Sequence, residues 1–268
     1  MKQGKGKHFS EYIIFLDTNA ITDLLLYFQH VDGRIIDLDE DCKVAIKKVK
    51  KHLTDNKLLI SDPAYDAISH GCKFYKEIIE RRKSLDDENT LRIYYSMFND
   101  IEARSVLLKA RLLLEFEKVY IPERIAVKSR LGTSLQVGYA DKIGKKLEEE
   151  LKIISELFSE KNIKVEKHED PQIRPGILTL TLEVVSVIQK YVIMEPFDLY
   201  IYASAICARS NEILTTDRDF RETVHNIISG EPGWAPVKSK LENDIKAILN
   251  YGTGPNNRTP LVLPDALG

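Results

Sequence analysis

The chain has 268 residues, of which 43% are hydrophobic and 30% are charged, and its formal net charge at pH 7 is -2. This composition is typical of a globular protein that can bury a sizeable core, and the balanced charge excludes an overall basic field for nucleic acid. No apolar run is long enough to cross a membrane, and the basic N-terminus lacks the cleavage site of a signal peptide.

The three cysteines, Cys42, Cys72 and Cys207, lie far apart and form no CxxC pair. Neither a disulfide framework nor a cysteine zinc site is therefore expected. A cytoplasmic location, where thiols stay reduced, is the simplest expectation for such a chain.

Three short apolar runs have the features of buried parallel strands, and each ends at an aspartate. They are YIIFLD (12–17), KLLISD (57–62) and EILTTD (212–217). Each is followed by a segment with helical spacing, as in folds that alternate strand and helix. The amphipathic segment 41–56 is expected to be a helix whose lysines face solvent.

The segment from 73 to 195 is predicted to be mainly helical, with one long or two shorter helices over 89–120 and further helices over 139–162 and 181–194. Prolines and a glycine indicate a loop over 165–176, and the proline- and glycine-rich end of the chain reads as irregular. The expected organisation is a core built from 1–72 and 196–250, a helical insertion over 73–195 and an arm over 251–268.

Aspartates stand where these strands end or the next helices begin. Asp17 ends the first run, Asp66 begins the helix after the second, Asp198 begins a helical face, and Asp217 and Asp219 follow the third run. The carboxyl ends of parallel strands meet at one edge of a sheet, where ligands bind. Carboxylates gathered there would repel one another, and a bound cation such as Mg²⁺ relieves that repulsion.

Taken in order, FLDTNAITDLL, Asp66 with Gly71 after it, FDLYIYASA and ILTTDRDF resemble the motifs of the PIN-domain ribonucleases. The resemblance covers about residues 10–72 and 196–230. It implies an α/β fold in which helices sandwich a parallel sheet, and a Mg²⁺- or Mn²⁺-dependent endoribonuclease that attacks RNA with metal-activated water. The family includes RNA-processing nucleases and the toxins of toxin–antitoxin pairs.

Carried over by position, the resemblance implies catalytic acids at Asp17, Asp66, Asp198 and Asp217. Metal ligands would be Asp17, Asp198, Asp217 and Asp219, and the residues that hold the loops and position water would be Thr18, Asn19 and Thr215. The second acid of the family is usually glutamate, so Asp62 and Glu183 stay open as alternatives to Asp66. The arginines considered for RNA phosphates are Arg81, Arg82 and Arg218.

Simpler interpretations stay open for each residue. Asp17, Thr18 and Asn19 suit a helix N-cap, Asp66 suits a first helical turn, and the arginines suit a solvated surface. At the level of function, the alternatives are a PIN-like module that binds RNA without cleaving it, and a DNA nuclease. A haloacid-dehalogenase-like phosphatase needs a second aspartate where this chain has Asn19. An RNA substrate is expected, an antitoxin or a second copy of the chain are open partners, and no membrane is expected.

Overall fold

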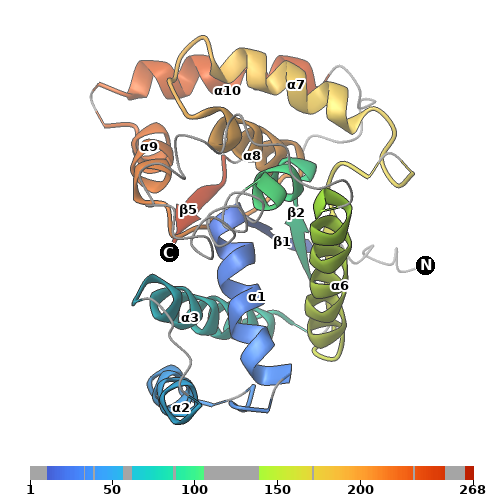
Figure 1. The fold of residues 1–268 in the computed structure, drawn as a ribbon. Helices are drawn as coiled ribbons and strands as arrows, with labels where there is room; N and C mark the ends of the chain where they lie inside the picture. The colour runs from blue at the N-terminus through green and yellow to red at the C-terminus, as the bar shows by residue number, and fades with distance from the viewer. Residues whose placement is uncertain are drawn as a thin grey trace, which may run out of the picture.

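The computed structural model describes residues 11–32, 34–38, 40–56, 62–86, 89–105, 139–170, 172–231, 233–250 and 263–268. Within these residues, five strands form one sheet in the order β3-β2-β1-β4-β5, and every neighbouring pair is parallel. The strands are β1 (Glu11–Leu16), β2 (Thr90–Tyr95), β3 (Ile163–Lys167), β4 (Glu212–Leu214) and β5 (Asp265–Leu267). The chain therefore has the α/β architecture with a parallel sheet that the apolar runs predict (Figure 1).

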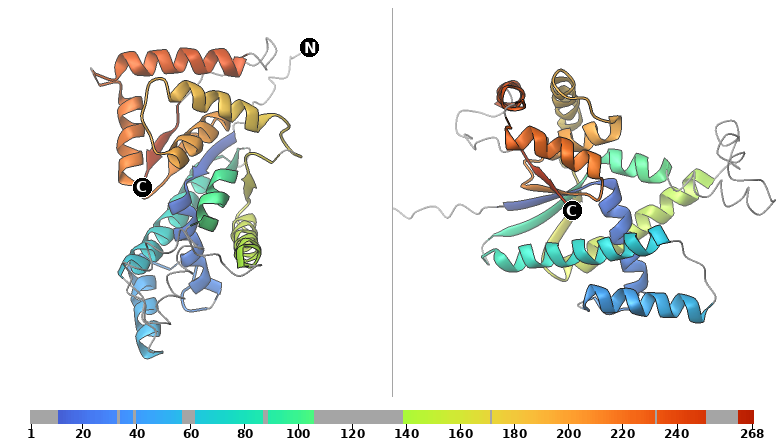
Figure 2. Two further views of the ribbon diagram at one scale, coloured as in Figure 1. Left: turned by 45° about the horizontal axis from the view of Figure 1, so that its top comes forward. Right: turned by 90° about the vertical axis from the view of Figure 1, so that its left-hand side faces the viewer.

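Helices cover both faces of the sheet (Figures 1 and 2). On the first side of the sheet lie α1 (Thr18–Asp32), α3 (Asp62–Ser84) and α6 (Tyr139–Ser159), with α2 (Cys42–Asp55) packed on α3. On the second side lie α7 (Ile177–Ile188), α8 (Pro196–Cys207) and α9 (Arg218–Ser229), with α10 (Ala235–Asn250) packed on α7 and α9. Because side chains alternate along a strand, β1 supplies both cores. Ile14 and Leu16 enter the first core, and Ile13 and Phe15 enter the second. Among the described residues, every helix is too short or too polar to span a bilayer.

Strand β2 corrects the helix predicted from residue 89 onwards. Residues 90–95 pair with β1 on one side and β3 on the other, and a helix begins only at residue 97. The signal that separates the two elements is Ser96, whose hydroxyl oxygen accepts a hydrogen bond from the Phe98 N–H at 3.1 Å, as an N-cap does. Both β2 and β3 lie within 73–195, so this segment contributes strands to the central sheet as well as helices.

Of the other expected elements, two helices are confirmed and the rest have different boundaries or lie outside the described residues. The helices over 41–56 and 139–162 are confirmed as α2 and α6. The helix expected over 181–194 begins earlier and ends earlier, as α7. The loop expected over 165–176 begins inside β3, and the arm expected over 251–268 ends in β5, which pairs with β4. The strand expected over 57–62 falls outside the described residues except for Asp62, which begins α3.

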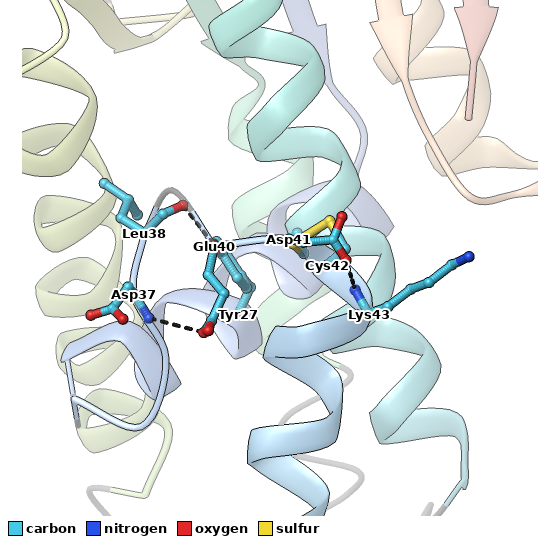
Figure 3. Close-up of a disulfide and its surroundings, with 8 residues drawn as sticks. Tyr27, Asp37, Leu38, Glu40, Asp41, Cys42 and Lys43 are labelled. Atoms are coloured by element: carbon cyan, nitrogen blue, oxygen red, sulfur yellow. Dashed lines mark hydrogen bonds between the residues drawn. A yellow bond between two sulfur atoms is a disulfide. The ribbon is translucent and has the colours of Figure 1, made fainter.

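A disulfide between Cys42 and Cys72 joins the first turn of α2 to the middle of α3 (Figure 3). The expectation that the chain has no disulfide is therefore wrong. The two Cα atoms are 5.7 Å apart, within the usual range for such a bond. A pairing of two cysteines among three, across 30 residues, cannot be deduced from sequence because it depends on how the two helices pack. Since disulfides are rare in a reducing cytoplasm, the bond lends no support to that compartment.

Breaking this bond is expected to destabilise the protein. It closes a loop with a sequence separation of 30 residues, for which the chain-entropy model gives about 3–4 kcal/mol. We expect Cys42→Ser to lower the free energy of unfolding in urea by about 3 kcal/mol. Adding a reductant should lower the stability of the wild-type protein to the same level and leave that of the variant unchanged. A wild-type protein whose stability does not respond to reductant would contradict this prediction.

Candidate active site

Asp17 lies at the carboxyl end of β1, the central strand, and is only 3% exposed. Its Oδ1 accepts the Thr18 N–H at 2.6 Å, and its Oδ2 accepts the Thr215 hydroxyl at 2.6 Å. Burial raises the pKa of Asp17 to about 6, against the effect of these two hydrogen bonds. The negative charges of Glu102 and Asp217 raise it further. Asp17 is therefore a buried, oriented carboxylate with other acids close by.

Asp217 reaches the same edge from the loop between β4 and α9. Its backbone N–H donates to Thr215 Oγ1 at 2.9 Å, and its Oδ1 caps α9 by accepting the Phe220 N–H at 2.9 Å. Thr215 therefore contacts both acids, because its hydroxyl donates to Asp17 and accepts from Asp217. This contact agrees with the supporting role expected for Thr215.

Asp198 and Glu102 add two more carboxylates to those of Asp17 and Asp217. Asp198 lies in the first turn of α8, and burial raises its pKa to about 7. The charges of Asp17 and Asp217 raise this pKa further, and those of Glu195 and Glu102 add smaller contributions. Glu102 lies on the 97–105 helix, which follows β2, and its Oε2 accepts the Thr18 hydroxyl at 2.5 Å.

Sequence reasoning missed Glu102 because the apolar spacing over residues 89–120 predicts helix throughout and so hides the end of β2. Once residues 90–95 are recognised as a strand beside β1, the helix after it begins at the same carboxyl edge as Asp17. The signal that could have found Glu102 is the capping serine at position 96, which marks the end of one element and the start of the next.

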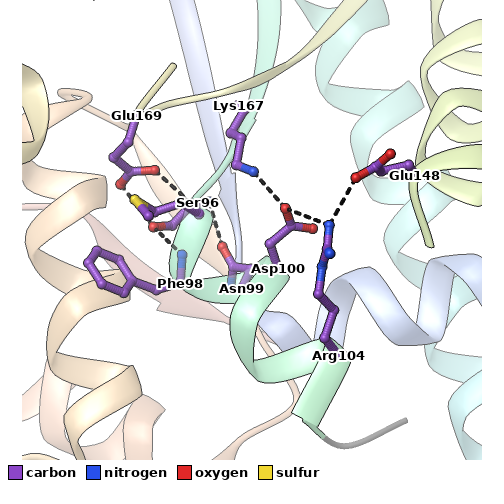
Figure 4. Close-up of polar contacts among 9 residues, drawn as sticks. Ser96, Phe98, Asn99, Asp100, Arg104, Glu148, Lys167 and Glu169 are labelled. Carbon is purple, nitrogen blue, oxygen red and sulfur yellow. Dashed lines mark hydrogen bonds and ion pairs between the residues drawn. The ribbon is translucent and has the colours of Figure 1, made fainter. Parts of the chain in front are cut away.

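A buried polar network holds the 97–105 helix against its neighbours (Figure 4). Glu169, which follows β3, accepts the Ser96 hydroxyl at 2.8 Å and the Met97 N–H at 2.8 Å. The Ser96 hydroxyl also lies 3.3 Å from that of Ser204 on α8, the helix that carries Asp198. These contacts link the elements that bear Glu102 and Asp198, so the network fixes how the two acids approach the end of β1.

Asp23, on α1, is a second residue that sequence reasoning missed. It is 7% exposed, and burial and the charge of Asp17 raise its pKa to about 7, while the nearby Thr216 side chain acts to lower it. Its Oδ2 is buried without a hydrogen-bond partner in the described structure and lies 3.6 Å from His70 Nδ1 on α3. Helix α3 approaches α1 closely here because Gly71 has no side chain. A Cβ at Gly71 would lie 2.1 Å from the Asp23 carbonyl oxygen.

Several predicted residues are not joined to this group. Asp66 is exposed on α3, Asp219 is exposed in the first turn of α9, and Glu183 is exposed on α7. Asn19 is also exposed, and its backbone carbonyl accepts the Thr22 hydroxyl. The side chain of Asp62 lies outside the described residues.

The three arginines also lie apart from the acids or are already paired. Arg81 forms a salt bridge at 3.2 Å with Glu212, which begins β4 at the opposite edge of the sheet, and Arg82 lies on the same last turn of α3. Arg218 pairs with Glu222 at 2.7 Å and lines a cavity of about 650 Å³ between α9 and β5. Of the three arginines, Arg218 is the one closest in sequence to an acid of the candidate site, because it directly follows Asp217.

The donor chemistry of the site fits a hard divalent cation, although the side chains are not arranged as a finished metal cage. In the described part of the chain, no three Asp, Glu, His or Cys side chains are placed so that they could hold an ion together. The four acids nevertheless offer only oxygen donors, which Mg²⁺ and Mn²⁺ prefer. Each carboxylate oxygen that accepts one hydrogen bond keeps a second lone pair, so the contacts of Asp17 and Asp217 leave room for ligation.

The repulsion among these acids is expected to appear as a pH dependence of stability. Because folding raises the pKa of Asp198 from 3.8 to about 7, the folded protein holds a proton that the unfolded chain has lost between about pH 4 and pH 7. The free energy of unfolding of the metal-free protein should fall as the pH rises through this window. In EDTA at pH 8, we expect Asp198→Asn to be about 1–2 kcal/mol more stable than wild type, a value reduced for solvent screening.

This difference between Asp198→Asn and wild type should nearly vanish at about pH 3, below the ordinary aspartate pKa, where Asp198 is protonated in the folded protein and largely so in the unfolded chain. Urea unfolding at both pH values measures it. The same difference at both pH values would contradict the prediction, because it would have to come from packing rather than from charge.

Comparison of the chain with models of known protein families, with curated proteins and with solved structures found no significant match.

Proposed function

We propose that the chain is a Mg²⁺- or Mn²⁺-dependent nuclease of the PIN type that cleaves RNA. The observation that carries this proposal is the meeting of Asp17, Glu102, Asp198 and Asp217 at the carboxyl edge of a parallel sheet. These acids come from four different parts of the chain, and the charges of the other three raise the pKa of Asp198. Acids that destabilise one another in this way are typical of a site that binds a cation.

Within the proposal, Glu102 takes the place of the second acid, which the sequence assigned to Asp66. The PIN family usually has a glutamate there, and Glu102 is bonded to Thr18, the neighbour of Asp17. Asp66 is exposed and is not among the groups that shift the pKa of Asp17 or Asp198. Glu102 as the second acid therefore agrees better with the family pattern than Asp66, whose side chain is shorter by one methylene.

Asp17, Glu102, Asp198 and Asp217 would hold the cation. When bound, it would lower the pKa of a water molecule and neutralise charge on a scissile phosphodiester. The protein's own contribution is orientation. The Thr18 N–H and the Thr215 hydroxyl fix the two oxygens of Asp17, and the first turn of α9 fixes Asp217. No histidine or covalent nucleophile is needed for such a hydrolysis.

A cleavage assay tests the proposal. Single-stranded RNA, structured RNA and DNA are incubated with the purified protein in Mn²⁺ or Mg²⁺, with and without EDTA. We expect cleavage of RNA that leaves a 5′-phosphate and a 3′-hydroxyl and that stops in EDTA. Cleavage of DNA alone would favour the DNA nuclease, and cleavage that continues in EDTA would refute the metal-dependent reaction. Absence of both cleavage and calorimetric Mn²⁺ binding would favour a non-catalytic module.

A further inference from the structure

The hydroxyl of Thr18 stands between two side chains of the 97–105 helix. Its oxygen lies 3.0 Å from the amide nitrogen of Asn99 and 2.5 Å from Oε2 of Glu102. An amide nitrogen only donates hydrogen bonds, whereas a hydroxyl has a single hydrogen and can also accept. Because the Thr18 oxygen accepts from Asn99, its one hydrogen is left for Glu102.

The orientation of the Asn99 amide is fixed by the backbone. Its Oδ1 accepts the N–H of Ser96 at 2.6 Å, and a backbone N–H cannot accept in return. Asn99 is 1% exposed and Ser96 is fully buried, so water does not offer replacement partners. A flipped amide would set two donors against each other and leave both unsatisfied in the interior, at a large cost. Figure 4 shows Ser96 and Asn99 joined at the start of this helix.

Thr18 also contacts the other acid of the pair. Its backbone N–H donates to Asp17 Oδ1 at 2.6 Å, while its hydroxyl donates to Glu102 Oε2. One residue therefore sets the spacing of two carboxylates. The Thr18 hydroxyl can donate to Glu102 only if its hydrogen points that way. The hydrogen bond that it accepts from Asn99 favours this orientation.

We propose that Asn99 is a positioning residue that directs the Thr18 hydroxyl toward Glu102 and so fixes the Glu102 carboxylate beside Asp17. The order of donors runs from the Ser96 N–H to Asn99, from Asn99 to Thr18, and from Thr18 to Glu102. The consequence for catalysis rests on the nuclease function proposed above, whereas the direction of the hydrogen bonds does not.

The substitution Asn99→Asp tests this chain of hydrogen bonds, called the relay below. It keeps the shape of the side chain and the acceptor for the Ser96 N–H but removes the donor to Thr18. The Thr18 hydroxyl should then turn to the introduced carboxylate and release Glu102. We expect kcat for RNA cleavage to fall about 10- to 100-fold, the usual range for a lost outer partner of a metal-site ligand, with KM within about threefold. Thr18→Ser, which retains the hydroxyl, should keep most of the activity, and Thr18→Val should lose as much as Asn99→Asp.

Asn211→Asp is the matched control. Asn211 also accepts a backbone N–H through Oδ1, that of Ile13 at 2.8 Å, but it lies just before β4, at the opposite edge of the sheet. The same change of charge there should leave kcat and KM as in wild type. If Asn99→Asp cleaves as fast as Asn211→Asp while Asp17→Asn is inactive, the relay is overturned.

A second readout does not need cleavage. The ¹³C chemical shift of the Glu102 side-chain carboxyl is measured by NMR at pH 7.5 in EDTA. We expect it to move in Asn99→Asp and in Thr18→Val, and to stay in place in Asn211→Asp and Thr18→Ser. If the wild-type protein cleaves nothing, the proposed function fails, and this shift alone decides the relay. An unchanged Glu102 shift in Thr18→Val overturns the relay even if Asn99→Asp does not fold.

Discussion

Asp17→Asn is expected to lower the rate of RNA cleavage by about 1,000-fold, the scale of losses measured when a preorganised electrostatic group is removed from an active site. Asp17 ends the central strand, and both of its oxygens are oriented by hydrogen bonds. An amide has the same shape but no negative charge, so it would bind a divalent cation poorly. The fold should survive, because the asparagine oxygen can still accept the Thr18 N–H and its nitrogen can donate to Thr215.

Single-turnover cleavage in Mn²⁺ measures this loss, and thermal unfolding shows whether the variant is folded. Asp219→Asn is the matched control, because it removes the same charge from an exposed position two residues after Asp217. We expect the control to keep wild-type activity within about threefold, as surface changes usually do little. A folded Asp17→Asn/Asp217→Asn double variant that cleaves at the wild-type rate would refute the proposed site.

Glu102→Gln is expected to have the second largest effect, a loss of cleavage of about 100-fold or more. The substitution preserves an oxygen that accepts the Thr18 hydroxyl, so the 97–105 helix should stay in place. What is lost is the charge that acts on both Asp17 and Asp198. The metal-free variant should therefore be at least as stable as wild type at pH 8, while it binds Mn²⁺ more weakly in calorimetry.

The variant Asp66→Asn distinguishes Glu102 from Asp66 as the second acid of the site. Asp66 is exposed on α3, so we expect its variant to retain activity and Mn²⁺ affinity within about threefold of wild type. The reverse result, in which Asp66→Asn is inactive and Glu102→Gln is active, would restore Asp66 as the second acid and remove Glu102 from the site.

The parts of the fold that could be predicted are those whose signal is local. The run from Ile13 to Leu16 is apolar throughout because β1 is covered on both faces, and such a run, followed by a helical segment, favours a buried parallel strand. The acid after it, and Asp217 after β4, then follow from the rule that parallel strands end at one edge. Asp17 occupies the N-cap position of α1, because its backbone carbonyl accepts the Ile21 N–H at 3.0 Å, but its Oδ1 accepts the N–H of the adjacent Thr18 rather than one further into the first turn.

The parts that could not be predicted depend on neighbours in space. Strand β2 has apolar residues that continue in helical spacing into the next element, and only its pairing with β1 and β3 decides that it is extended. Glu102 was hidden by that error, since its position relative to Asp17 depends on where the strand ends. Asp23 gave no signal because its burial results from the close approach of α3 at Gly71.

The position of a bound cation tests the central claim most directly. Crystals of the wild-type protein soaked in Mn²⁺ are measured at a wavelength where manganese scatters anomalously. The proposed function predicts a manganese peak about 2.0–2.5 Å from oxygens of Asp17 and of at least one of Glu102, Asp198 and Asp217. A structure without manganese at this edge of the sheet, at a concentration that supports cleavage, would contradict it.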